Sequence, residues 1–562
     1  MFLGGNSYLL NLLQQELQRR IGTLPCVEIS LVQGEDRDAE VTECLLVQPK
    51  SLSEISRAVR AAKTMRLNVR TRGRSTSGVK GLYADQFTLL VDCQTLNDTP
   101  RIELTTVIAD REIDEQVPCL RILVSVGIDE LLDFQINNRI ELTQPIDESL
   151  PQGTVVGALV SKYPVGEWGV KNGPQFFAQN RIFCVRVVDS KGDLCDYTGE
   201  QEVNYCKASL GMLGIVYDVF LEYHPMSMSK VSAEIHTWNS LLSSDLLYER
   251  LTESSFVEIL YLPYCSINLD EPTDDRIKQW SAKDDEVLLR CGKTAHNRLV
   301  ECDPIDSTHR KQIHILDPVV GPRVREFFER PEETPELLAK AFVYVKREVE
   351  RFKEIQQYTP WAVNMVKIAD LPTNSLRLSM TTGSDLKEFK KAMEVILSSL
   401  TPMTAEDGRL LFPVNYCIRI HLPGLLNPHN ILDISNAVKM PMEDWRQPFI
   451  VCLIGFQVPL LTSSWQVMTC QLIRSLCKEK NIRLSHLKEV CHDTRLLSEV
   501  LHMSVEESSK ALKKKVASTD RDGIFFTKSL AHLLNAEIDD YRLSYRQQRD
   551  KLFSHLLKKL SK

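Results

Sequence analysis

The first folded segment is marked by a regular change of apolar pattern along residues 44–93. The apolar run Cys44–Val47 is short and ends before Pro49, which is typical of a strand. Residues 51–67 begin with a serine and, three residues later, a glutamate, and then repeat apolar side chains at helical spacing. Residues 68–70 and 87–93 return to strand-like sequence. We therefore predict strand, helix, strand and strand in that order.

The loop between the last two strands is rich in glycine and hydroxylic residues, with the sequence RTRGRSTSGVKG over residues 70–81. Backbone amides in loops of this composition often point at a phosphate group. A Gly/Ser-rich stretch between two strands is also frequently only a turn. Both interpretations are compatible with the loop taken alone.

Four later segments of the first half have patterns of their own. Residues 122–142 read as a strand followed by a helix that begins near Asp129. Small residues over 153–160 would let the backbone approach a ligand closely. Residues 176–197 predict two strands joined by a hairpin at Lys191-Gly192-Asp193. In 208–225, Gly211 and Gly214 bracket a tight turn into a strand.

The second half contains apolar strands that carry isolated charges. Residues 256–280 predict a strand, a break at Pro263 and a returning strand. In the segment FPVNYCIRIHLPG, Arg419 alternates with Ile418 and Ile420, so it should point to the opposite face of the sheet from them. This pattern favours an antiparallel sheet.

The order of these segments resembles the FAD-binding half of the vanillyl-alcohol-oxidase superfamily. Residues 256–280, 412–424 and 481–490 are similar to the substrate domain of its sugar-lactone and alditol oxidase branch. A doubly wound nucleotide-binding sheet fits less well, because no glycine fingerprint directly follows the first strand. The resemblance implies an α+β fold: a two-subdomain FAD-binding domain of the vanillyl-alcohol-oxidase type, an antiparallel-sheet substrate (cap) domain and a helical tail. We predict a helical segment over 1–40, the FAD-binding domain over 41–226, the cap domain over 227–495 and the tail over 496–562.

The resemblance also implies a flavin cofactor, FAD. Thr76 stands where many members carry the histidine that bonds covalently to the flavin, so we predict that FAD is held noncovalently. The second cofactor segment departs from the family as well, because Ser161-Lys162-Tyr163-Pro164 replaces a Gly-Thr-His sequence and proline lacks an amide donor. The predicted cofactor-binding residues are Arg72, Gly73, Arg74, Ser75, Thr76, Ser77, Gly157, Ser161, Gly211, Gly214 and Ile215.

Three residues are candidates for the chemistry. The resemblance favours His486 as the base, Arg419 as its electrostatic partner and Lys488 as a third contributor. Cys417 occupies the position of the family's glutamate two residues before the arginine, and Leu487 replaces the tryptophan after the histidine. A surface or core role remains an alternative for each of the three candidates.

Charge and composition exclude several classes of partner and site. A net charge of -7 does not provide the basic field that nucleic acid requires, so no nucleic-acid partner is predicted. The 15 cysteines form no CxxC pair and the histidines near the candidate site show no i, i+4 pair, so we predict reduced thiols and no metal. The most apolar stretch, Phe449 to Leu461, contains Gln457 and Pro459 and is too short to span a bilayer. These features predict a cytoplasmic protein without an integral membrane segment.

The two ends of the chain differ in character. Leu9, Leu10, Leu13 and Leu17 share one face of an N-terminal helix, which is typical of a docking helix and not of a signal peptide. The C-terminal tail is rich in lysine and long polar side chains and predicts solvated helices, through which a protein partner could bind.

Two functions are compatible with the sequence. The first is an FAD-dependent oxidoreductase acting on a small-molecule substrate, namely a sugar lactone, polyol or related alcohol. The second is a degenerate, noncatalytic member that keeps the fold as an interaction or regulatory protein. The ordered segments favour the first, whereas Thr76, the Ser161 to Pro164 stretch and Cys417 favour the second.

Overall fold

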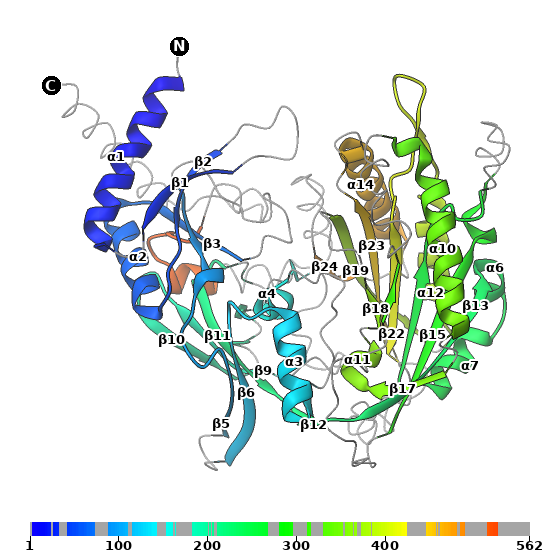
Figure 1. Cartoon of the computed structure of the whole chain (residues 1–562). Coiled ribbons are helices and arrows are strands. Elements are labelled where there is room, and N and C mark those ends of the chain that lie inside the picture. The colour runs from blue at the N-terminus through cyan, green and yellow to red at the C-terminus, as the bar shows by residue number, and fades with distance from the viewer. Residues whose placement is uncertain are drawn as a thin grey trace.

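A computed structural model shows an N-terminal half built on two sheets and a second half built on one large sheet (Figure 1). One hydrophobic cluster continues from Leu10 through both halves to Phe526, so the halves share a buried core. The structure describes residues 3–23, 26–32, 42–73, 88–110, 115–142, 153–160, 163–164, 182–199, 202–203, 205–206, 209, 211–267, 280–295, 312–315, 330–351, 354–363, 365–367, 373–383, 385–423, 446–456, 458, 461–479, 484–488 and 514–526.

The first sheet contains the predicted strand-helix-strand unit. Its strand order is β1-β2-β4-β3, with β2–β4 and β4–β3 parallel and β1–β2 antiparallel. Glu54 is the part of the predicted helix start that bonds to the backbone: its Oε2 accepts from the Lys50 amide at 2.8 Å, whereas Ser51 makes no side-chain cap bond. The elements are α1 (Leu3–Ile21), β1 (Val27–Val32), β2 (Thr42–Val47), α2 (Leu52–Met65), β3 (Asn68–Arg72) and β4 (Thr88–Asp92).

Helix α1 packs within the chain. Leu10, Leu13, Leu17 and Ile21 are buried, and the helix contacts α2, β1 and β2. Its apolar face therefore covers the first sheet and α2, as a docking helix would.

The second sheet is antiparallel, with strand order β10-β9-β11-β6-β5. The predicted hairpin joins β9 to β10, and Gly192 there has a φ of 77° that favours glycine. The predicted helix after residue 122 begins at Ile128. The elements are β5 (Ile102–Asp110), β6 (Glu115–Leu123), α3 (Ile128–Asn138), β7 (Ile140–Glu141), α4 (Val155–Val160), β9 (Ile182–Val188), β10 (Leu194–Thr198), β11 (Ile215–Glu222) and β12 (His224–Pro225).

The second half of the molecule corresponds to the predicted cap domain and is called the cap half below. It is built on a nine-stranded sheet with order β17-β13-β15-β14-β22-β23-β19-β24-β8. The strand that pairs with β14 on its return is β15, which begins at Glu286 and therefore lies after the segment 256–280 in which the returning strand was predicted. One edge is supplied by β8 (Tyr163–Pro164), two residues of the N-terminal half. The other elements of the sheet are β13 (Met228–Thr237), β14 (Phe256–Tyr261), β15 (Glu286–Ala295), β17 (Glu354–Tyr358), β19 (Thr373–Gly383), β22 (Cys417–Pro423), β23 (Arg446–Phe456) and β24 (Leu484–Lys488).

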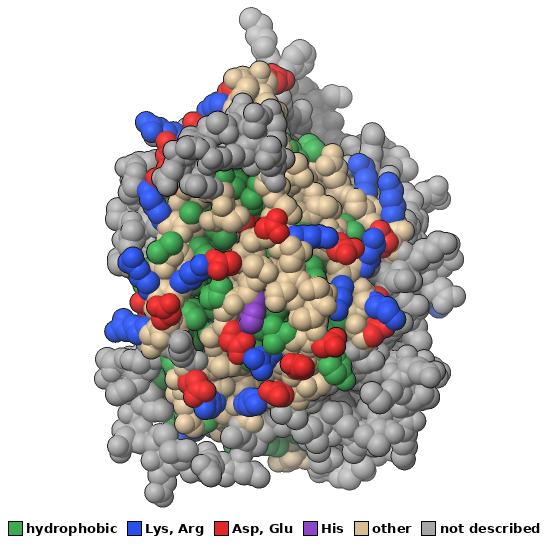
Figure 2. Space-filling model, turned by 90° about the vertical axis from the view of Figure 1, so that its right-hand side faces the viewer, with side chains coloured by type: hydrophobic (Ala, Val, Ile, Leu, Met, Phe, Trp, Pro, Cys, Tyr) green, Lys and Arg blue, Asp and Glu red, His purple; other side chains and the backbone are tan. Residues whose placement is uncertain are grey.

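Helices cover one face of this sheet. The Phe389 ring in α12 contacts Phe449 in β23 with centroids 5.1 Å apart, and Trp238 in α6 contacts Tyr261 in β14 at 5.6 Å. Figure 2 shows the outer side of the cap, where acidic and basic side chains are intermixed without a field of one sign. The remaining elements of the cap half are α6 (Trp238–Ser243), α7 (Leu246–Glu253), β16 (Ile313–His314), α10 (Thr334–Arg351), α11 (Thr359–Val363), β18 (Val366–Lys367), α12 (Lys387–Ser398), β20 (Met403–Thr404), β21 (Leu410–Leu411) and α14 (Thr462–Lys478).

A buried polar network joins the halves where the chain passes from β12 to β13. The Ser227 amide donates to Glu141 Oε2 at 3.0 Å, and the hydroxyls of Ser227 and Thr359 lie 2.6 Å apart. The hydroxyl of Ser229 lies 2.8 Å from that of Thr359. Because buried polar groups are costly to leave unpaired, this network fixes how the halves meet.

The described part of the C-terminal tail, residues 514–526, packs on the N-terminal half (orange-red beside β3 in Figure 1). Val516, Asp520 and Phe525 are buried there. The expectation of solvated helices is therefore wrong for this part of the tail, because its apolar residues are covered by the first sheet. The rest of 496–562 lies outside the described residues.

Candidate active site

The first two predicted cofactor segments meet at the ends of β3 and α4. A Cβ placed on Gly73 would lie 3.9 Å from Thr154 Oγ1. That oxygen also accepts from the Gly157 amide in α4 at 3.1 Å. A Cβ on Gly157 would approach it to 2.9 Å, which leaves no room for a side chain without a shift. Small residues therefore let two loops from different subdomains converge.

The third predicted segment has two glycines with different roles. Gly214 has a φ of 141°, and a Cβ there would lie 2.3 Å from the Val188 carbonyl oxygen, so close strand packing explains it. Gly211 has a φ of 76° and faces Arg70, because a Cβ would lie 3.5 Å from Arg70 Nη1. Ile215 follows as the fully buried first residue of β11.

Arg72 provides a positive charge beside these segments. It is the last residue of β3, and its buried Nε has no hydrogen-bond partner among the described residues. A guanidinium nitrogen at the start of a small-residue loop suits an anionic group such as a diphosphate. The residues that the structure describes therefore fit a phosphate-bearing cofactor. Arg74, Ser75, Thr76, Ser77 and Ser161 lie outside the described residues.

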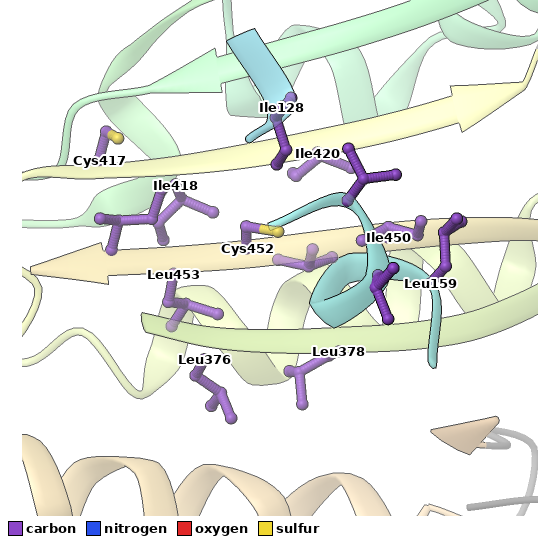
Figure 3. Packing of buried hydrophobic residues seen from close by; sticks show 14 of the residues in the cluster. Ile128, Leu159, Leu376, Leu378, Cys417, Ile418, Ile420, Ile450, Cys452 and Leu453 are labelled. Atoms are coloured by element: carbon purple, nitrogen blue, oxygen red, sulfur yellow. The ribbon is translucent and has the colours of Figure 1, made fainter. Parts of the chain in front are cut away.

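Three charged residues of the cap sheet share the face opposite its covering helices. Glu258 in β14 pairs in register with Arg290 in β15, and Arg419 in β22 has the same parity as Glu258. Arg290 Nη2 donates to the carbonyl oxygen of Ala362 in α11 at 2.6 Å. In Figure 3, Ile128 and Leu159 of the N-terminal half lie against β22 and β23. The charged side chains therefore lie on the side of the sheet that faces the N-terminal half.

These charges form a buried cluster around one carboxylate. Arg419 Nε donates to Glu258 Oε1 at 2.9 Å, its Nη2 does so at 2.5 Å, and Arg290 Nη1 donates to Glu258 Oε2. Each of the three side chains is no more than 2% exposed. Burial alone would raise the pKa of Glu258, but the positive charges of Arg419 and Arg290, together with His421, outweigh it and lower the pKa to about 2.

His421 extends the cluster toward less buried surroundings. It lies opposite Glu258 in the strand register, with Nε2 3.8 Å from Glu258 Oε1, and its side chain is 20% exposed. Arginine does not lose its proton at neutral pH, and Glu258 is a weak base because its pKa is so low. The histidine is therefore the side chain of this cluster that is both a possible proton acceptor and partly exposed.

The three residues predicted for catalysis do not lie together. Arg419 is in β22, whereas His486 and Lys488 are in β24, with β23 and β19 between them. Three strand spacings of about 4.8 Å place the two backbones roughly 14 Å apart. His486 instead pairs in register with Pro164, so it lies beside the altered second cofactor segment.

Glu258, Arg290 and His421 are not among the site residues predicted from the sequence. Cys417 does stand two residues before Arg419, but the carboxylate comes from the neighbouring strand β14. A signal was present, because Glu258 and Arg290 are each a single charge within an apolar strand and such charges require partners. Only the strand order shows which charges meet.

The described ranges contain neither a candidate metal site nor a candidate membrane span. Among those residues, no group of three histidine, cysteine, aspartate or glutamate side chains could hold a metal ion. No helix in the same ranges combines the length and apolar character needed to cross a membrane.

Sequence comparison identified no relatives, since no protein-family model and no curated protein matches the chain. Solved structures do match. The cholesterol oxidase of Brevibacterium sterolicum is 13% identical with a TM-score of 0.62, covering 91% of this chain and 97% of its own. A histidine-to-alanine variant of that enzyme is 12% identical with a TM-score of 0.63, covering 91% and 98%. A solvent-stable cholesterol oxidase is 11% identical with a TM-score of 0.59, covering 90% and 98%.

At such low identity the comparison concerns the fold. The match extends over both halves, and the alternation of helices with antiparallel sheets agrees with the fold class predicted from the sequence. The chain therefore has the α+β fold of these cholesterol oxidases.

Proposed function

We propose that the chain is a flavoprotein that binds FAD noncovalently and oxidises an alcohol, with a sugar lactone, polyol or related alcohol as the substrate class. The observation that carries this proposal is the buried cluster of Glu258, Arg290 and Arg419 on the side of the cap sheet that faces the N-terminal half. Burying charges is expensive, and a cap that served only as a scaffold would be more stable with apolar residues there.

The cofactor would be held by the loops that converge beside α4. Arg72 and the backbone at Gly73 are the described groups suited to its diphosphate, and the small residue Gly157 lets the two loops approach each other. Thr76 offers no imidazole for a covalent link to the flavin. When bound, the isoalloxazine ring of FAD supplies the hydride acceptor.

Residues of the cap would stabilise negative charge and accept a proton. Glu258 holds the two guanidinium groups in place, so that they present positive charge toward the N-terminal half without reorganising. A histidine would accept the proton of the substrate's hydroxyl group as hydride leaves the carbon that carries this group. His421 is favoured by its place beside the cluster, and His486, nominated by the family resemblance, is the alternative base.

The spectrum of the purified protein tests the proposal. We expect flavin absorption bands, or uptake of added FAD by the apoprotein, and release of the flavin into the supernatant after denaturation and precipitation. A panel of lactones, polyols and simple alcohols, mixed anaerobically with the loaded protein, should then include a compound that bleaches those bands. Flavin that stays on the precipitated protein would contradict noncovalent binding.

The second candidate function is a noncatalytic interaction or regulatory protein. It is favoured by Thr76 at the position of the linking histidine and by proline in the second cofactor segment. Absence of FAD uptake, or a loaded protein that no alcohol reduces, would support this candidate over the enzyme.

A further inference from the structure

β3 is the edge strand of the first sheet, and the C-terminal segment 514–526 covers that edge. The Val69 amide donates to the Ile524 carbonyl oxygen at 2.8 Å. Asn68 Nδ2 lies within hydrogen-bonding distance of the carbonyl oxygens of Gly523, Ile524 and Phe526, at 3.2, 3.3 and 3.4 Å. The strand that leads to Arg72 and Gly73 is therefore held from both sides.

The segment has a shape that presents these carbonyl groups to β3. Asp520 is buried, and its carboxylate accepts from the amides of Ile524 at 3.0 Å and Phe525 at 2.8 Å. Gly523 takes a φ of 67°, which reverses the chain between them. The carboxylate of Asp520 thus fixes the turn that reaches β3.

The same segment also contacts residues next to the second, antiparallel sheet of the N-terminal half. Lys515 Nζ donates to both carboxylate oxygens of Glu202, at 2.8 and 2.6 Å. Arg70 Nη1 donates to the Phe525 carbonyl oxygen at 3.3 Å and lies next to Gly211 of the third cofactor segment. The C-terminal segment therefore ties together the bases of two predicted cofactor segments.

We propose that residues 514–526 position the cofactor site, so that the affinity for FAD depends on contacts more than 400 residues away from the loop in sequence. The inference rests on the proposed function, because it assumes that FAD is the ligand of these loops. Asn68 and Asp520 are its positioning residues. Neither is placed to touch the cofactor; both hold the strand from which the first loop departs.

The physical reason is the free energy of ordering the loop. An edge strand paired on one side opens locally more easily than a strand held on both sides. If β3 must be ordered before the ligand binds, the apparent dissociation constant rises as the ordered fraction falls. Coupling is reciprocal, so bound FAD must stabilise the C-terminal segment by the same factor.

Alanine variants of Asn68 and Asp520 in the full chain test the proposal through FAD affinity. Asn68→Ala removes the side-chain donor facing three carbonyl groups and keeps the Val69 bond; Asp520→Ala removes the acceptor that fixes the turn. We expect each to raise the dissociation constant for FAD, measured by flavin fluorescence, at least tenfold. Asp520→Asn keeps one carboxamide oxygen as an acceptor and should give an intermediate value.

The matched control is Tyr264→Phe, which removes a buried hydrogen bond of 2.8 Å to Leu400 in the cap. It should lower the melting temperature and leave the FAD dissociation constant within twofold of wild type. If Asn68→Ala and Asp520→Ala also lower only the melting temperature, the segment is a structural support and the proposal is overturned.

A second readout does not depend on turnover. Hydrogen exchange of the wild-type chain should show slower amide exchange in 514–526 when FAD is added. Unchanged exchange there, with FAD bound, would overturn the proposal. A wild-type chain that takes up no FAD would overturn both this inference and the proposed function, whereas uptake with unaffected variants overturns only the inference.

Discussion

The two halves of the molecule build their polar sites in opposite ways. In the N-terminal half the predicted cofactor loops are contiguous pieces of sequence, and small residues such as Gly73 and Gly157 let backbones approach. In the cap half, the cluster takes one charge from each of three strands, at Glu258, Arg290 and Arg419. The first kind of site can be recognised locally, whereas the second exists only once the sheet has formed.

Removing the carboxylate of the cap cluster should be the most destabilising change. Glu258→Gln leaves two buried guanidinium groups without their charge partner, so we expect a loss of about 3–5 kcal/mol in the free energy of unfolding. Urea titration measures it. The control is Glu234→Gln, which removes a half-exposed carboxylate paired with Arg250 and should cost less than about 1 kcal/mol. Equal effects of the two changes would show that the cluster is not a tightly coupled unit.

The same carboxylate should make the cap sensitive to acid. The pKa of Glu258 in the folded state, about 2, lies below its ordinary value of 4.5. Its contribution to stability is therefore present above about pH 4.5 and is lost as the pH falls toward 2, on the order of 3 kcal/mol in total. Unfolding by urea at a series of pH values measures the loss. Glu16→Gln removes a half-exposed surface carboxylate whose pKa is also lowered, and it should leave the acid loss of the cap in place.

Catalysis should distinguish the cluster histidine from the one nominated by family resemblance. With an alcohol that reduces the loaded protein, His421→Gln should slow flavin reduction about a hundredfold, the low end of what a general base contributes. His236→Gln, on a histidine that pairs with Glu234, should leave the rate unchanged. A large effect of His486→Gln with little effect of His421→Gln would move the base to β24.

The smallest effect concerns the close approach beside α4. Gly157→Ala should displace Thr154 Oγ1 and break its bond to the Gly157 amide, at a cost of about 1 kcal/mol. Gly73→Ala places its methyl group at 3.9 Å from the same oxygen and should not destabilise the apoprotein. Thermal unfolding of both variants measures the difference. If Gly73→Ala is the more destabilising change, the two loops do not meet as described.

Sequence patterns were sufficient where one element determines its own structure. The helix over 51–67, the hairpin at Gly192 and the helix after Gly127 depend on local periodicity and turn residues, and all three are present. Glu258 could not be assigned in this way, because its partners are fixed by the strand order in a sheet of nine strands. His486 and Arg419 were placed in one site for the same reason, although two strands separate theirs.

The C-terminal tail shows another limit of sequence reasoning. Lysines 513–515 suggested a solvated surface, but Lys515 pairs with Glu202, and the apolar residues that follow it are buried. Residues far apart in sequence gave no local sign of this packing. The assignment of the cap to the sugar-lactone and alditol oxidase branch remains a prediction.

The strand pairing of β8 with β24 affects how the two halves can move. Tyr163 and Pro164 leave the N-terminal half and extend the sheet of the cap, so main-chain hydrogen bonds stitch one half to the other. An outward rotation of the cap half would have to break the pairing of β8 with β24 and also the hydrogen-bond network around Ser227. The pairing therefore opposes an outward swing of the second half away from the first.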